Sequence, residues 1–144
     1  MVWDPNNPVE GLRRIVTGRD AEGKSIVTID GPPAGTAGAG ALQEIWQTEG
    51  ALVDSRGTDD AGAGPPVLSP SPGGSKFRWF ILPPRDPKMS KEDVEARYAA
   101  GFASMNASHE RVDTSRDPAM HKTKTIDYIV LLSGKVTLML DKEE

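Results

Sequence analysis

His121, Thr123 and Asp127 are the residues whose types and spacing are best suited to chemistry. An imidazole and a carboxylate can together bind a first-row metal or transfer a proton. Side chains two positions apart on an extended strand point to the same face, so the three converge if the segment is extended and any bend keeps that parity. Two protein ligands are fewer than the three of a metal site with open positions. The spacing therefore leaves metal binding and acid–base chemistry both open.

The segment that holds these residues is predicted to be a β-hairpin. Residues 126–132 and 135–140 are rich in apolar and β-branched side chains, and Ser133-Gly134 between them suits a tight turn. In the second run one face holds Val136, Leu138 and Leu140, and the other holds Lys135, Thr137 and Met139. This alternation predicts a sheet with one face packed on a core.

The preceding part of the chain is predicted to contain further strands and long loops. We expect a first hairpin from residues 12–17 and 24–29, and strands at 41–47 and 76–82. The last of these is apolar on both faces, which predicts that it is covered on both. Residues 31–40 and 49–64 are rich in small and polar residues, so we expect exposed loops there.

A single helix is predicted ahead of the hairpin. Ser90 and Asp93 have the spacing of a capping box, and Val94, Tyr98 and Phe102 follow at intervals of four. We place this helix at residues 91–103.

The composition fits one domain of 144 residues with a net charge of −4, which favours neither nucleic acid nor an anionic membrane as a partner. The absence of cysteine excludes disulfides and thiolate metal sites. No apolar run approaches the roughly 20 residues of a membrane span, and the first eight residues do not have the pattern of a secretory signal. We therefore expect a cytoplasmic protein.

The intervals around His121 resemble the first motif of the cupin family. In that motif a Gly precedes His-x-His by five residues, and a Glu and a second Gly follow. Here His121 and Thr123 are followed by Asp127 after three residues and by Gly134 after six more. The chain has Ser115 at the first Gly of the motif, Thr123 at its second His and Asp127 at its Glu.

A narrower resemblance accounts for these departures. Small single-domain cupins, among them the cupin-domain-containing oxidoreductases of fungal polyketide gene clusters, have a His-x-Thr-x-Thr-x-Asp-Tyr segment ahead of a Leu-Ser-Gly turn. The matching residues here are His121, Thr123, Thr125, Asp127, Tyr128 and Leu132-Ser133-Gly134. The amino-terminal portion is similar to that branch in Arg14 to Gly18 with Asp20 and Gly23, in residues 29–32, and in Glu44-Ile45-Trp46.

The resemblance implies a mainly β fold, a cupin-type β-sandwich or jelly-roll barrel with one short helix. It implies an oxidoreductase of secondary metabolism that acts on a small aromatic or polyketide intermediate. His121 and Asp127 would be its catalytic or metal-ligating residues, and Thr123, Thr125 and Tyr128 would line the substrate pocket. The cofactor would be a divalent first-row metal (Fe, Mn, Ni or Zn) or none. We expect one domain over 1–144, with strands and loops in 1–88, a helix in 90–103 and the motif with its hairpin in 118–144.

Several alternatives stay open at this point. The second cupin motif has no counterpart in the 144 residues, so we expect either a truncated chain or one that forms a homodimer through exposed strand edges. The chain could be a non-catalytic small-molecule-binding module or an inactive fragment instead of an enzyme. His121 could be an ordinary surface histidine, and Asp127 and Tyr128 could be ordinary sheet residues. His109 has no partner at ligand spacing and is predicted to be a solvated loop residue.

Overall fold

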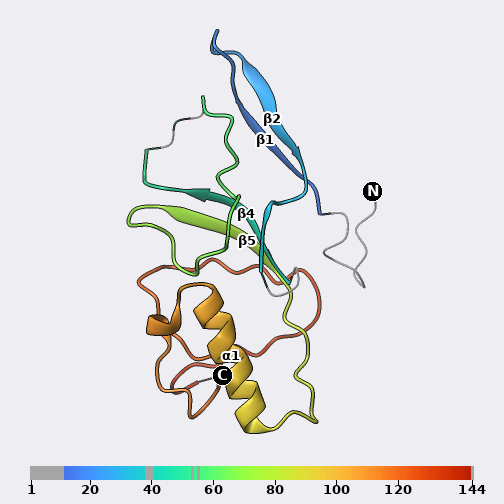
Figure 1. The fold of residues 1–144 in the computed structure, drawn as a ribbon, viewed down its shortest axis with the longest axis vertical. Coiled ribbons are helices and arrows are strands. Elements are labelled where there is room, and N and C mark those ends of the chain that lie inside the picture. The colour runs from blue at the N-terminus through green and yellow to red at the C-terminus, as the bar shows by residue number, and fades with distance from the viewer. Residues whose placement is uncertain (1–11, 38–40, 53, 55, 144) are drawn as a thin grey trace. The chain divides into compact units, whose positions relative to one another are not determined.

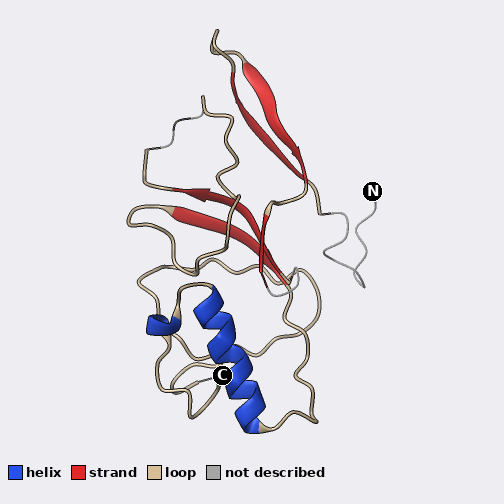
Figure 2. Ribbon diagram, in the orientation of Figure 1, coloured by secondary structure: helices blue, strands red, loops and turns tan. Residues whose placement is uncertain are grey.

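The computed structural model describes residues 12–37, 41–52, 54 and 56–143. The first eight residues, in which we expect no secretory signal, lie outside the described residues. The chain divides into two compact units. The first unit comprises Met1–Pro66 with Pro70–Pro83, and the second comprises Val67–Ser69 with Pro84–Glu144. The described residues are mainly β, with two antiparallel sheets and one α-helix (Figures 1 and 2).

The first sheet is the predicted amino-terminal hairpin. β1 (Arg14–Arg19) and β2 (Ser25–Gly31) pair antiparallel, with a bulge between Val16 and Thr17. The turn is closed by the carboxylate of Asp20, whose Oδ1 accepts hydrogen bonds from the backbone N–H groups of two later turn residues at 3.0 and 2.8 Å. Aspartate is favoured in turns because it can hold the backbone in this way. The hairpin prediction is confirmed.

The second sheet has the order β3-β4-β5, all antiparallel. β4 (Leu42–Thr48) and β5 (Ser75–Phe80) confirm the strands expected at 41–47 and 76–82. β3 (Gly35–Ala37) lies inside the segment expected to be only a loop, so that expectation is wrong there. Its three residues are too few to form a visible alternation, and they are ordered by pairing with β4.

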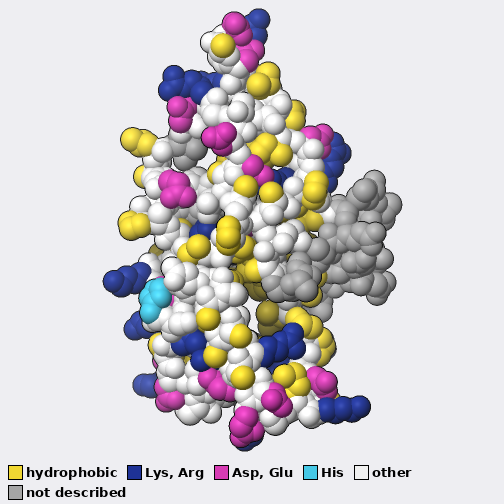
Figure 3. All heavy atoms as spheres, in the orientation of Figure 1, with side chains coloured by type: hydrophobic (Ala, Val, Ile, Leu, Met, Phe, Trp, Pro, Cys, Tyr) yellow, Lys and Arg dark blue, Asp and Glu magenta, His cyan; other side chains and the backbone are white. Residues whose placement is uncertain are grey.

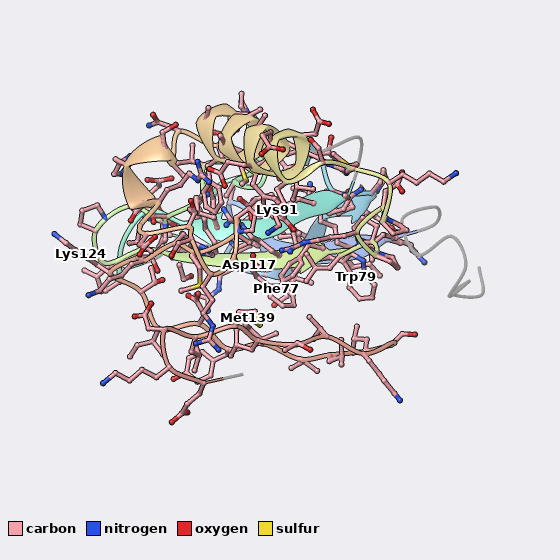
Figure 4. All side chains as sticks on the ribbon, turned by 90° about the horizontal axis from the view of Figure 1, so that it is seen from below. Phe77, Trp79, Lys91, Asp117, Lys124 and Met139 are labelled. Carbon is pink, nitrogen blue, oxygen red and sulfur yellow. The ribbon has the colours of Figure 1, made fainter. Side chains whose placement is uncertain are left out.

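The expectation that β5 is covered on both faces is also wrong. Phe77 is 68% exposed and Phe80 is 48% exposed. Because these two residues lie on opposite faces of the strand, neither face is fully covered. Phe77 and Trp79 project to the same side of β5 (Figure 4). The described part of the chain buries few apolar side chains: Phe102, Ala107, Pro33 and Pro66. A core this small cannot cover a sheet on two sides.

Charged side chains hold the first unit together where apolar packing is sparse. The side chain of Glu44 on β4 is 3% exposed, and it accepts from Arg78 at 2.7 Å and from Lys76 at 3.1 Å. Lys76 also donates to the side-chain oxygen of Gln47 at 2.5 Å. A buried carboxylate needs such partners, since an unpaired charge in the interior costs several kcal/mol. These contacts join β4 to β5 through their side chains as well as their backbones.

Arg14 connects the hairpin to the rest of the first unit. Its guanidinium donates to the carbonyl oxygen of Ile45 at 2.8 Å and forms an ion pair with Asp60. The loop that contains Asp60 was expected to be exposed, but Gly62 is buried there and that expectation is wrong for it. A Cβ at Gly62 would lie 2.9 Å from Arg14 Nη1 and 3.0 Å from the Glu44 carbonyl oxygen. Glycine therefore allows the loop to approach the sheet.

The predicted helix of the second unit is confirmed as α1 (Lys91–Ser104). Ser90 caps it, because its Oγ accepts from the Asp93 backbone N–H at 3.0 Å. The helix ends in a Schellman motif: Ala107 N donates to the Phe102 carbonyl at 2.8 Å, and Asn106 adopts a left-handed φ of 53°. A 3₁₀ turn, η1 (Ser108–Glu110), follows.

The predicted hairpin at 126–132 and 135–140 is not formed as a sheet, which corrects that expectation. The chain bends at Ser133-Gly134, where the φ of Gly134 is +85°, but no strand is present between residues 111 and 143. An isolated two-stranded hairpin is marginally stable in water, and no third strand lies beside this one within the described residues. We call residues 126–140 the tail segment. Its exposed large apolar side chains are Ile126, Tyr128, Ile129, Val130, Leu131, Leu132, Val136, Leu138 and Leu140.

Apolar side chains are also visible elsewhere on the surface, as the yellow atoms of Figure 3 show. No helix within the described residues is both long enough and apolar enough to cross a bilayer.

Candidate functional site

His121 lies at the end of a short turn that Asp117 organises. Asp117 Oδ1 accepts from the Ala119 backbone N–H at 2.8 Å, and its carbonyl accepts from the Met120 N–H at 3.0 Å. The turn delivers His121 into an antiparallel bridge with Arg111. The backbone of the histidine is thus fixed on both sides.

Arg85 fixes Asp117 in turn. Its Nη2 lies 2.7 and 2.6 Å from the two carboxylate oxygens, and Asp117 is almost fully buried. The hydrogen bond to Asp117 is the main reason that the pKa of Arg85 is raised above its usual value. The guanidinium also lies over the ring of Tyr98, 5.4 Å from its centroid. Helix α1 therefore supports the turn through an aromatic contact.

The imidazole of His121 packs on the buried ring of Phe102, with centroids 5.0 Å apart and the planes inclined by 55°. The Arg111 guanidinium also contacts this ring, at 5.8 Å from the centroid, and donates to Glu95 at 2.6 Å. These contacts restrict the imidazole ring, because rotation would remove it from Phe102.

The hydrogen bond of the imidazole determines its tautomer. His121 Nδ1 lies 2.8 Å from the carbonyl oxygen of Ala119. A carbonyl oxygen can only accept, so Nδ1 must carry a proton in this arrangement. In the neutral ring Nε2 then has a free lone pair, as in a histidine that binds a metal or accepts a proton.

A chain of hydrogen bonds joins three of the other predicted site residues. Thr125 Oγ1 donates to Asp127 Oδ1 at 2.8 Å, and Thr123 Oγ1 lies 2.6 Å from Thr125 Oγ1. Because the single hydroxyl proton of Thr125 points to the carboxylate, Thr123 must be the donor to Thr125. These hydrogen bonds bring the three polar groups together on one side of the segment, as a spacing of two allows.

The structure does not unite all the predicted residues. Among the residues that it describes, no hydrogen bond joins His121 to Asp127, and no group of three His, Asp or Glu side chains is close enough to hold a metal. Asp127 is exposed, and Tyr128 is 93% exposed. His109 is exposed in η1, with Nε2 3.4 Å from a Glu110 carboxylate oxygen, in a place that suits a solvated residue.

Sequence reasoning missed the residues that support the histidine. Arg85, Asp117 and Arg111 precede the motif, and no regular interval relates them to it. The Asp117-Pro118 dipeptide is a turn signal, and it was the only local indication of this arrangement. Phe102 was identified as an apolar helix residue, but the sequence does not say which ring it contacts.

The arrangement can accept a proton at His121 Nε2 and can hold a polar ligand group beside Asp127. The comparisons with known proteins add nothing to this: the chain matches no family model, no curated protein sequence and no solved structure.

Proposed function

We propose that the chain is a cupin-type protein that binds a small aromatic or polyketide intermediate of secondary metabolism, with His121 as a proton acceptor. The orientation of the imidazole is the observation that supports this most directly. Its Nδ1 is engaged by the Ala119 carbonyl, and its Nε2 is left with a lone pair. In this proposal the protein is cytoplasmic, and residues 118–140 form part of the wall of a jelly-roll pocket.

The proposed substrate class suits such a base. Phenols, and carbons that lie between two carbonyl groups, are acidic enough for imidazole to remove a proton. Asp127 would accept a hydrogen bond from a substrate hydroxyl, because the threonine chain engages Oδ1 and holds the carboxylate in place. Thr123, Thr125 and Tyr128 would line the pocket.

A resident metal fits the described residues only in part. His121 and Asp127 offer one nitrogen and one carboxylate, donor types that suit Fe, Mn, Ni or Zn. Three protein ligands are usual for a catalytic site, and the described residues bring no such group together. We therefore assign to His121 and Asp127 acid–base and binding roles that need no metal.

The test is a binding and turnover measurement on the purified chain with a panel of phenols and 1,3-dicarbonyl compounds. We expect His121→Ala to abolish turnover and to weaken binding, whereas His109→Ala should change neither. His109 is a matched control because it is the other histidine of the chain and is exposed. If no compound of either class stabilises the protein or is converted, the proposal is wrong.

A non-catalytic binding module is the second candidate, and the exposure of Asp127 and Tyr128 favours it. This candidate predicts ligand binding without turnover, and His121→Ala would then weaken binding only. Metal analysis of the wild type and of His121→Ala separates a metalloenzyme from both, since only a metalloenzyme loses metal in the variant.

A further inference from the structure

The tail segment has a backbone that is not paired into a sheet within the described residues. Leu140 N donates to the Glu143 carbonyl at 2.9 Å, and no other backbone hydrogen bond is made by residues 126–140 within the described chain. Apart from the Leu140 N–H, the N–H and C=O groups of the segment are therefore available to another strand. Such groups are a template for pairing with a second chain.

The side chains of the tail segment also favour association. Its nine exposed large apolar side chains are about two thirds exposed on average. A side chain of this kind has on the order of 100 Å² of apolar surface, so the segment offers on the order of 600 Å². A stable interface of standard size buries about 800 Å² on each partner, including its polar rim. Part of this apolar surface, at Val136, Leu138 and Leu140, lies in the run that a second copy can cover.

The second half of the segment is complementary to itself. If residues 135–140 pair antiparallel with the same residues of another copy about Leu138, Val136 lies opposite Leu140 and Leu138 lies opposite its own copy. The same register places Lys135 opposite Asp141 at both ends. Opposite charges across an antiparallel pair are stabilising. A shift by one position toward the carboxyl terminus would place Lys135 opposite Lys142, which is repulsive, and a shift in the other direction would place Lys135 opposite Leu140 and lose the ion pair.

The end of the segment is held in a position that suits this pairing. Arg116 Nη1 donates to the backbone carbonyl of Asp141 at 2.8 Å, and Nη2 donates to that of Glu143 at 3.3 Å. The side chain of Asp141 makes none of these contacts, and the residue is exposed. Its carboxylate is therefore free to meet a lysine of a second chain.

We propose that two copies of this chain associate through residues 135–140, antiparallel about Leu138, into a four-stranded sheet with residues 126–132 as its outer strands. A sheet of three or more strands is stable in water where an isolated two-stranded hairpin is marginal. In the four-stranded sheet each inner strand has hydrogen-bonded neighbours on both edges. The two-fold symmetry lets one surface serve both partners. This inference rests on the tail segment alone and does not depend on the proposed function.

The first test is sedimentation velocity of the 144-residue chain over a range of concentrations. We expect a reversible dimer. Leu138→Lys should weaken it on the order of a hundredfold, because two like charges would meet at the centre of the interface. Leu52→Lys is the matched control, since Leu52 is 98% exposed and lies outside the segment. It should leave the dissociation constant unchanged.

The second test reverses the end charges. Lys135→Glu and Asp141→Lys should each weaken the dimer on the order of tenfold or more, because each places like charges opposite one another at both ends. An equimolar mixture of the two variants should recover the wild-type affinity as a heterodimer, since every end pair is then of opposite sign.

Recovery in the mixture supports the proposed register and could not come from a loss of folding. A wild type that stays monomeric at every concentration overturns the proposal, and so does a dimer that Leu138→Lys leaves intact. A mixture that stays as weak as the single variants would also overturn it. All three outcomes concern assembly only, so they leave the ligand-binding proposal standing.

Discussion

The β1–β2 hairpin and the tail segment have the same local design but different outcomes. Each has two runs rich in apolar and β-branched side chains around a turn with a glycine at positive φ, +79° at Gly23 and +85° at Gly134. Only β1 and β2 form a ladder of hydrogen bonds. Such runs and a turn glycine are therefore insufficient to form a sheet here.

The difference lies in the contacts that hold the two strands together. In the first hairpin Asp20 closes the turn, Arg13 pairs with Asp30 through two hydrogen bonds of 2.5 and 2.6 Å, and Arg14 is anchored to Ile45 and Asp60. The tail segment has no cross-strand ion pair among the described residues. The apolar side chains of the tail segment are exposed, so their packing does not replace the missing ion pairs.

The largest effect is expected from the buried carboxylate of the second sheet. Glu44→Ala should reduce the free energy of unfolding of the first unit by about 3–5 kcal/mol, because it removes the acid that Lys76 and Arg78 share. Urea titration followed by tryptophan fluorescence would measure this. Glu22→Ala, at an exposed turn position, is the control and should change stability by less than about 0.5 kcal/mol.

Removal of the hairpin anchor should have the next largest effect. Arg14→Met keeps an unbranched side chain but deletes the contacts to Ile45 and Asp60, and we expect a loss of about 2 kcal/mol. Hydrogen exchange of the β1 and β2 amides would show the loss directly. Arg19→Met, at the exposed end of the same strand, should leave that protection unchanged. Equal losses in the two variants would contradict the anchoring role.

A smaller effect is expected from pH. The hydrogen bond from Arg14 holds the pKa of Asp60 below its ordinary value, so the folded state binds this proton less readily than the unfolded state. The stabilisation is complete above about pH 4 and is lost as the pH falls toward the lowered pKa. Thermal unfolding between pH 6 and 2 should show a flatter decline for Asp60→Asn than for the wild type. Identical slopes would exclude this contribution.

The smallest effect is expected from a substitution that makes the tail segment pair its two runs as the first hairpin does. Ser133→Asn creates an Asn-Gly turn, whose central residues adopt positive φ with little strain, and should favour strand pairing by about 0.5 kcal/mol. Circular dichroism at low protein concentration would report a gain in β signal. Ser133→Ala is the control and should give none. No gain with asparagine would show that the turn does not limit pairing in this segment.

Features that depend on neighbouring residues were predictable from the sequence. The first hairpin, the Ser90 cap and helix α1 each follow from patterns a few residues long. The anchor of the hairpin was not predictable, because Arg14 and Asp60 are 46 positions apart and no regular pattern relates them. β3 was missed for the same reason, since its three residues become a strand only beside β4.

The candidate site also combines features that the sequence predicts with features that depend on distant residues. The spacing predicted that His121, Thr123 and Asp127 could share a side; the structure joins Thr123 to Asp127 through Thr125 by hydrogen bonds, and His121 bonds to Ala119 instead. The tautomer of His121 could not be predicted, because it depends on a carbonyl two residues earlier in a turn that Arg85 holds from outside the motif. The strands expected after the motif were wrong for a physical reason: local propensity cannot supply the third strand that a sheet in water needs.

The unpaired amides of the tail segment have a consequence for solvent access. Because these N–H groups have no backbone acceptor within the described residues, we expect residues 126–139 to exchange with deuterium faster than β4 and β5. An unpaired backbone of this kind can enter the active-site cleft of an endoprotease, and the exposed Tyr128 would offer it an aromatic side chain. We therefore expect proteases to cut the chain first within the tail segment, at a rate set by how often that segment is uncovered.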